Sequence, residues 1–191
     1  MPILYRGAGV GTYWHQRDAR VTGFTPQHPG MSPSLDRLIG HISYGTVTSP
    51  YVSLTRSYGV AWSYAMSLGH SQPAQSNPAY VYEVEIDEPL PLGLQLLDPV
   101  QTIAAAMPSP SHRISYQHDG LPSFLLGVID PMGMEDFLKL PPPQPPPGGG
   151  TPRPPNLTRE LEALVRALRD AEILAVGNIP AACVRHRFPV W

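Results

Sequence analysis

Three short segments of this chain carry side chains that could act together on a ligand. Ser53 and Thr55 are two residues apart on an expected strand, so their hydroxyls share one face of it. Arg6 near the N-terminus supplies a cation, and Asp170 and Glu172 near the C-terminus supply two carboxylates. A strand that carries hydroxyls and runs directly into a helix is a natural place for a ligand. The three segments form one site only if the fold brings them together.

The elements that must position these residues can be predicted from local patterns. Ser57 is the expected N-cap of a helix over residues 57–68, directly after the strand with the hydroxyls. A second helix, capped by Asn156 and running to residue 168, is predicted by apolar residues that share one face with a 3.6-residue period: Leu157, Leu161, Leu164, Val165 and Leu168. That helix must pack on the core, which returns Asp170 and Glu172 to the sheet. The expected strands cover residues 3–6, 51–55, 79–86, 173–176 and 183–190.

In this order the three segments resemble the motifs of the ADP-ribosyltransferase family of the Arg-Ser-Glu, cholera-toxin-like type. Arg6 matches the arginine on the family's first strand. Residues 53–55, Ser-Leu-Thr, match a Ser-Thr-Ser run, with Leu54 in place of Thr and Thr55 in place of the second Ser. Asp170-Ala171-Glu172 matches Glu/Gln-X-Glu, with Asp in the first position. The resemblance implies an α+β fold, a split β-sandwich with flanking helices.

The resemblance also implies NAD as a substrate, without a metal, and gives three residues catalytic roles. Glu172 would hydrogen-bond the ribose 2′-hydroxyl and stabilise the positive charge that develops when the nicotinamide–ribose bond breaks. Arg6, with Gly7 beside it, would bind the pyrophosphate and nearby ribose through its planar donor fork. Ser53 would hold Glu172 in position.

The remaining implied contacts concern nicotinamide and the acceptor. Thr55 would support the nicotinamide pocket, and Tyr51 or Trp62 would pack on a ring, although both aromatic residues also suit an ordinary core. Asp170 would bind the acceptor, where a carboxylate suits a basic group such as a guanidinium. The acceptor is expected to be a macromolecule: protein, DNA or RNA.

Other residues compete for these roles. Glu83 and Glu85 form a Glu-Val-Glu sequence, but both lie inside an expected strand whose solvent face explains them. Gln117-His118-Asp119 also echoes the carboxylate motif, yet a turn between strands at residues 114–116 and 124–129 is the simpler interpretation. His41, expected in a loop, is either a surface residue or a contact to the nicotinamide ribose.

Composition restricts the class of protein. The 191 residues are 42% hydrophobic and nearly neutral, with 13 basic and 15 acidic residues, so one domain is expected and no overall charge draws the chain to nucleic acid or to a membrane. The single cysteine, Cys183, excludes an internal disulfide framework. The sequence has no apolar run that resembles a signal peptide or a membrane span, which predicts a cytoplasmic chain or a domain delivered as part of a larger toxin.

Four further segments complete the expected organisation. A short helix is predicted over residues 34–39, with Gly40 ending it, and helical pieces are predicted at 94–97 and 100–106. Nine of the fifteen residues from 141 to 155 are proline and three more are glycine, which predicts an exposed linker.

Three functional readings follow from the sequence. The first is an NAD-dependent ADP-ribosyltransferase, a toxin or effector that a cognate immunity or antitoxin protein would bind. The second is an NAD glycohydrolase of the same fold, in which water replaces the acceptor. The third is a non-catalytic interaction module that displays the proline-rich segment to an aromatic groove on a partner.

Overall fold

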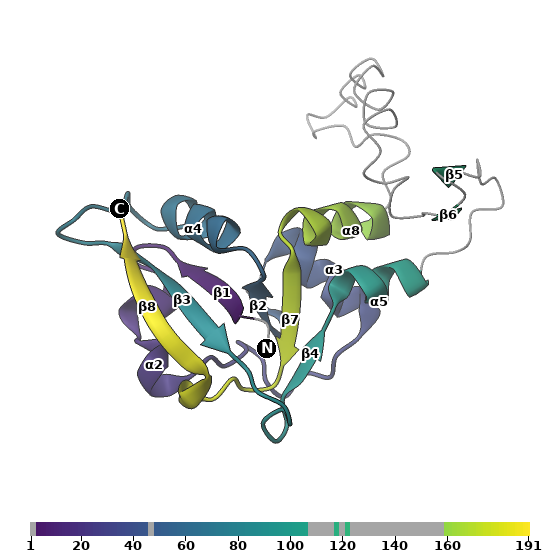
Figure 1. Ribbon diagram of the computed structural model, residues 1–191, viewed down its shortest axis with the longest axis horizontal. Coiled ribbons are helices and arrows are strands. Elements are labelled where there is room, and N and C mark those ends of the chain that lie inside the picture. Colours follow the sequence, from purple (N-terminus) through teal and green to yellow (C-terminus); the bar gives the residue numbers. More distant parts are fainter. Residues whose placement is uncertain (1–2, 46–47, 107–116, 119–120, 123–158) are drawn as a thin grey trace, which may run out of the picture.

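A computed structural model of the chain describes residues 3–45, 48–106, 117–118, 121–122 and 159–191. Within these residues, six strands form an antiparallel sheet in the order β4-β7-β2-β1-β3-β8, flanked by helices (Figure 1). The expected α+β class is therefore confirmed. The strands of the sheet are β1 (Ile3–Ala8), β2 (Tyr51–Thr55), β3 (Ala79–Glu85), β4 (Gln95–Leu97), β7 (Glu172–Val176) and β8 (Val184–Val190).

The sheet opens between its two central strands. The register of β1 with β3 runs through six residue pairs from Ile3 to Ala8, whereas the register of β1 with β2 joins a single pair, Tyr5 and Thr55. Beyond that pair the two strands diverge. The sheet consequently has two halves, β8-β3-β1 on the left of Figure 1 and β2-β7-β4 on the right.

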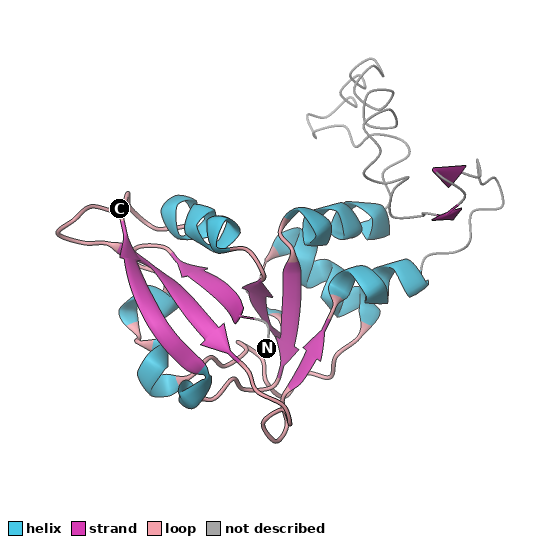
Figure 2. Cartoon of the chain, viewed as in Figure 1, coloured by secondary structure: helices cyan, strands magenta, loops and turns pink. Residues whose placement is uncertain are grey.

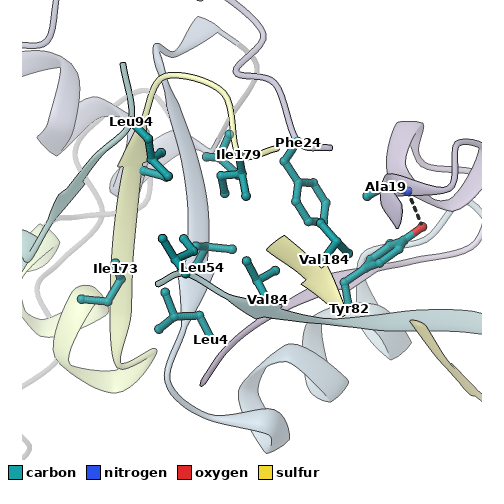
Figure 3. Packing of buried hydrophobic residues seen from close by; sticks show 14 residues of the cluster. Leu4, Ala19, Phe24, Leu54, Tyr82, Val84, Leu94, Ile173, Ile179 and Val184 are labelled. Atoms are coloured by element: carbon teal, nitrogen blue, oxygen red, sulfur yellow. Dashed lines mark hydrogen bonds between the residues drawn. The ribbon is translucent and has the colours of Figure 1, made fainter. Parts of the chain in front are cut away.

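A buried cluster of apolar side chains joins these halves (Figure 3). Successive residues of a strand point to opposite faces, so each strand sends alternate side chains into the cluster. Leu4 and Val84 come from one half, and Leu54 and Ile173 come from the other. Tyr82 also belongs to the cluster, and its hydroxyl accepts a hydrogen bond from the Ala19 amide at 3.5 Å.

Helices cover the remaining faces of both halves (Figure 2). Helices α3, α5 and α8 bury a second apolar cluster against β2 and β7, which includes Leu38, Ile103, Leu164 and Leu174. Helix α4 packs closely on β1, because a Cβ atom at Gly7 would lie 2.1 Å from the Ala61 carbonyl oxygen. The described helices are α1 (Tyr13–Gln16), α2 (Ala19–Thr22), α3 (Leu35–Tyr44), α4 (Tyr58–Ser67), α5 (Pro99–Ala106), α8 (Arg159–Arg169) and the 3₁₀ turn η2 (Ala181–Cys183).

Several local predictions are confirmed. Ser57 caps α4, where its hydroxyl accepts a hydrogen bond from the Val60 amide at 3.3 Å. The strands expected at residues 51–55, 79–86, 173–176 and 183–190 are present with bounds shifted by at most one residue, and the first strand extends to Ala8. Helix α5 covers the helical piece expected at 100–106. Local chemistry thus specifies these elements well.

The predicted end of the helix at Gly40 is wrong. Helix α3 continues through Gly40 and ends before Gly45, whose φ of 88° is a conformation that glycine adopts easily. A glycine inside a helix costs about 1 kcal/mol. The burial of Leu38 and Ile39 before Gly40 and the packing of Ile42 after it on the same apolar cluster outweigh that cost. His41 therefore lies in the last turn of a helix and not in a loop.

The helical piece predicted at residues 94–97 is also wrong. Residues Gln95–Leu97 form strand β4, which pairs with β7 from Gln95–Val176 to Leu97–Leu174. Pairing with a strand far away in the sequence satisfies the backbone polar groups of this segment, which a local pattern cannot indicate. On α8, Val165 was expected to face the core, but it is 40% exposed.

The middle of the chain offers little to compare. Strands β5 (Gln117–His118) and β6 (Leu121–Pro122) pair with each other, so Gln117 and His118 belong to a strand rather than to the predicted turn. The strands predicted at 114–116 and 124–129, the linker at 141–155 and the Asn156 cap lie outside the described residues.

Candidate functional site

The three strands β1, β2 and β7 bring Arg6, Ser53 and Glu172 to one cavity. Arg6 is on β1, Ser53 is on β2, and Glu172 begins β7, where it pairs with Thr55. A cavity of about 520 Å³ lies over the opening between β1 and β2, and these three side chains line it together with Thr55. This volume is within the range of small-molecule sites.

Arg6 spans the opening between the half-sheets. Its Nη1 donates a hydrogen bond to the Ser53 carbonyl oxygen at 2.6 Å. Its buried Nε has no hydrogen-bond partner within the residues that the structure describes, which leaves a donor available at the site. Burial lowers the pKa of Arg6 to about 10 while the nearby Glu172 raises it, so the guanidinium remains charged at neutral pH.

Glu172 is a buried carboxyl group, with 8% of the residue exposed. Burial raises its pKa to about 7, and the charge of Asp170 adds to that rise. A hydrogen bond from Ser53 and the positive charge of Arg6 act in the opposite direction. A carboxyl group that titrates near neutral pH inside a cavity is typical of a functional site.

His41 reaches the same carboxyl group through Ser53. Its Nε2 lies 2.6 Å from the Ser53 hydroxyl, and its Nδ1 lies 2.6 Å from the Ser49 hydroxyl. Burial, together with the charge of Arg6, lowers the pKa of His41 to about 3, so the ring is neutral. The 3.9 Å between Nε2 and a Glu172 carboxylate oxygen is therefore not an ion pair at neutral pH.

The hydrogen bonds of this chain fix the tautomer of His41. Ser53 donates to Glu172, so its oxygen accepts from His41 and the ring proton is on Nε2. Nδ1 then accepts from Ser49, whose oxygen accepts from the Tyr51 amide at 3.1 Å. Each donor points toward Glu172, which favours its ionised form.

A clamped corner between α8 and β7 sets the direction of Glu172. The Thr55 hydroxyl donates to the Asp170 carbonyl oxygen at 2.5 Å, and the Arg56 amide donates to the Ala171 carbonyl oxygen at 3.1 Å. Ala171 has a φ of 46°, a left-handed conformation that is unusual for a residue other than glycine. The chain therefore turns at Ala171 and is not extended there, yet Asp170 and Glu172 both line the cavity.

Two neighbouring side chains hydrogen-bond the carboxylate of Asp170. Tyr64 donates a hydrogen bond to Oδ2 at 2.5 Å, and Arg169 donates from Nε to Oδ1 at 2.7 Å and from Nη2 to Oδ2 at 2.8 Å. Burial and the carboxylate of Asp170 raise the pKa of Tyr64 to about 12, so the phenol keeps its proton. The carboxylate expected to receive an acceptor already holds three donors.

The two predicted aromatic contacts differ in position. Tyr51 lines the cavity, but its hydroxyl bonds the backbone of Ser34 and its ring meets the His41 ring at 5.5 Å in an edge arrangement. It supports the histidine. Trp62 is 43% exposed and does not line the cavity.

The rival carboxylates lie elsewhere. Glu83 is 3.8 Å from His186 and Glu85 is 3.0 Å from Arg185, so both bridge β3 to β8 across a face of the sheet. Neither residue lines the cavity.

The sequence left the role of His41 open, because the local pattern placed this residue in a loop. The signal that finds it is helical spacing: Leu38 and His41 are three residues apart, so both lie on the buried side of α3. A histidine on the apolar face of a helix that packs beside a strand with hydroxyls is a candidate partner for those hydroxyls.

No protein-family model matches the chain, and no curated protein matches it. Within the described part of the chain, His, Cys, Asp and Glu side chains do not gather in groups that could hold a metal ion. The helices in that part are all too short or too polar to cross a membrane. A functional assignment therefore depends on the geometry of the cavity.

Proposed function

We propose that this protein is an NAD-dependent ADP-ribosyltransferase that cleaves the nicotinamide–ribose bond and transfers ADP-ribose to a macromolecular acceptor. The observation that carries the proposal is the convergence of Arg6, Ser53 and Glu172, from three distant segments, on one cavity. The opening of the sheet between β1 and β2 supports the split β-sandwich that the sequence motifs imply.

Glu172 is suited to stabilise a positively charged ribose. When the bond between C1′ and nicotinamide breaks, the electron pair leaves on nicotinamide and positive charge develops on the sugar. A carboxylate that is held in a buried position, as Glu172 is, interacts more strongly with that charge than one in water would.

Arg6 is suited to hold the pyrophosphate of NAD. Its Nη1 is fixed on Ser53, while its buried Nε still lacks a partner within the described residues. A buried donor on a charged group gains most from an anionic acceptor. Binding a phosphate oxygen there would complete the hydrogen bonding of Arg6.

Ser53 and His41 are positioning residues in this proposal. Ser53 orients Glu172, and the neutral His41 orients Ser53 through a 2.6 Å contact. Because His41 carries no charge, it adds no repulsion to a cationic ligand. Its neutrality suits a site that must bind the positively charged ring of NAD.

The biological setting proposed for this activity is that of a toxin or effector, with a cognate immunity or antitoxin protein as its partner. The toxin or effector role and the partner protein are both what the resemblance in the sequence motifs implies.

Nicotinamide release tests the proposal directly. Purified protein incubated with NAD should release nicotinamide, and a lysate supplied with NAD labelled in its adenine ring should gain label on protein, DNA or RNA. Unchanged NAD together with an absence of NAD binding in calorimetry, for a folded sample, would contradict the proposal.

One observation favours hydrolysis as a second candidate function. Asp170 is already bonded to Arg169 and Tyr64, so a charged acceptor would have to displace them. Water needs no such displacement. Free ADP-ribose that appears as fast as nicotinamide, with no label on macromolecules, would identify an NAD glycohydrolase.

A further inference from the structure

Arg169, Asp170 and Tyr64 form a cluster beside the proposed catalytic carboxylate. Asp170 lies two residues before Glu172, and Tyr64 lies on α4. Both residues line the cavity. The Arg169 side chain is 62% exposed, while that of Asp170 is 15% exposed. A guanidinium thus lies on the solvent side of a carboxylate that faces the cavity.

Arg169 binds Asp170 as a guanidinium ligand would. Nε and Nη2 each donate to a different carboxylate oxygen, at 2.7 and 2.8 Å, which is the bidentate arrangement that arginine and carboxylate prefer. Nη2 also lies 3.2 Å from the Tyr64 hydroxyl, which itself donates to Asp170. Both oxygens of Asp170 are therefore engaged, and the local charge of the carboxylate is balanced.

We propose that Arg169 is a specificity-determining residue, which occupies the cation position at Asp170 and so excludes acceptors with a charged guanidinium. This inference rests on the proposed NAD chemistry. An incoming guanidinium meets a like charge at the rim and a carboxylate without free oxygens, and like charges placed together suppress wrong partners. The nucleophile that attacks the ribose is consequently not a cationic group.

A merely structural role for Arg169 makes a different prediction. The residue ends α8, and a cation in the last turn stabilises a helix through its dipole. Arg166 lies in the same turn and contacts Glu162 at 2.8 Å instead of Asp170. If Arg169 served only the helix, substitution of either arginine would change stability and leave acceptor choice unaffected.

Agmatine, a small guanidinium compound, is the probe that separates these roles. In the transfer, the C1′–N bond of NAD breaks with its electron pair on nicotinamide, a guanidine nitrogen of agmatine bonds to C1′, and the proton of that nitrogen passes to solvent. Mass spectrometry measures the ratio of ADP-ribosyl-agmatine to free ADP-ribose. The proteins compared are wild type, Arg169→Ala, Arg169→Gln, Arg169→Lys and Arg166→Ala.

The ratio should rise by roughly tenfold in Arg169→Ala and in Arg169→Gln, because each frees Asp170 and removes a positive charge. Arg169→Lys keeps the charge and should stay near wild type, as should Arg166→Ala. Agmatine binding measured by calorimetry without NAD should strengthen in the same two variants. A wild-type enzyme that modifies agmatine as readily as Arg169→Ala, or a ratio and binding that do not respond, would overturn the inference.

The experiment also separates this inference from the proposed function. Nicotinamide release with an unresponsive ratio rejects the role of Arg169 alone. An absence of nicotinamide release from every protein rejects the NAD chemistry, and the binding measurement then still reports whether Arg169 blocks a cation site at Asp170.

Discussion

Two pairs of carboxylates in this chain have the same spacing and different surroundings. Asp170 and Glu172 flank Ala171 at the corner between α8 and β7, and Glu83 and Glu85 flank Val84 inside β3. The first pair lines the cavity beside Arg6 and Ser53. The second pair contacts His186 and Arg185 on the neighbouring strand.

The comparison shows how position in the fold sets the surroundings of a carboxylate. Inside a strand, residues two apart share one face, and Glu83 and Glu85 there contact His186 and Arg185 of the neighbouring strand, whose side chains have access to water. At the corner, the turn at Ala171 directs Glu172 into a buried space where its charge is costly. In the proposed reaction, the positive charge that develops on the ribose offsets the cost of burying the Glu172 charge.

The sharpest test of this comparison is the matched pair Glu172→Gln and Glu83→Gln. Glu172→Gln should reduce nicotinamide release by about 10²–10³-fold, since a group that stabilises charge only in the transition state is lost while its size is kept. NAD affinity in calorimetry should change little. Glu83→Gln should leave turnover unchanged. Equal turnover in both variants would move the site away from the corner.

The unusual pKa of Glu172 predicts how stability depends on pH. A carboxyl group with a folded pKa of about 7 and an ordinary value of 4.5 favours the folded state below pH 4.5, and that contribution is lost as pH rises through 7. At about 1.4 kcal/mol per pH unit, the loss is roughly 3 kcal/mol. Glu172→Gln has no charge to bury, so it should gain stability relative to wild type between pH 4.5 and pH 8.5.

Urea unfolding of both proteins at these two pH values measures the effect, with Glu83→Gln as the control that should follow wild type. A stability difference between Glu172→Gln and wild type that is the same at both pH values would show that ionised Glu172 is not costly in the folded state.

Two arginines extend the comparison, because Arg6 faces the buried carboxylate and Arg185 faces Glu85. Arg6→Lys should raise the KM for NAD by roughly tenfold, since lysine cannot bond Ser53 and a phosphate oxygen through one planar group. Arg185→Lys should leave KM unchanged. Calorimetry of NAD binding checks the assignment, and equal affinity of Arg6→Lys and wild type would remove Arg6 from the site.

The parts of the site that depend on local patterns could be predicted from the sequence. Ser53 and Thr55 on a strand and Ser57 as a helix cap follow from side-chain alternation and capping preference. These features involve residues close together in the chain. The same is true of the helix that delivers Asp170 and Glu172 to the sheet.

The sequence could not predict the parts that depend on distant neighbours. Gly40 looks like a helix end until the burial of α3 against α8 is known, and that error hid the contact of His41 with Ser53. The left-handed turn at Ala171 has no local signal, because alanine rarely adopts it. Likewise, nothing near Asp170 in the sequence indicates that Tyr64 donates to it.

The smallest predicted effect concerns the hydrogen bonds that hold the corner at Ala171. Glu83 and Glu85 need no such bonds, because continuous pairing of β3 with β1 fixes the strand that carries them. The Thr55 hydroxyl donates to the Asp170 carbonyl oxygen and accepts from the Ser57 amide, and both hydrogen bonds are partly buried. Thr55→Val keeps the shape and removes both bonds, which should cost about 1–3 kcal/mol of stability. Turnover should fall severalfold because Glu172 loses a fixed direction.

Thr55→Ser, which restores the hydroxyl, should recover most of the turnover. Thr22→Val is the matched control, because Thr22 is an exposed residue whose hydroxyl also lies within hydrogen-bond distance of carbonyl oxygens, those of Gly23 at 3.1 Å and Asp18 at 3.4 Å. Its loss should cost little, since water replaces an exposed partner. Thermal unfolding and nicotinamide release measure both effects. If Thr55→Val keeps wild-type turnover despite its lower stability, the corner does not depend on this clamp, and the ladder between β2 and β7 alone directs Glu172 into the cavity.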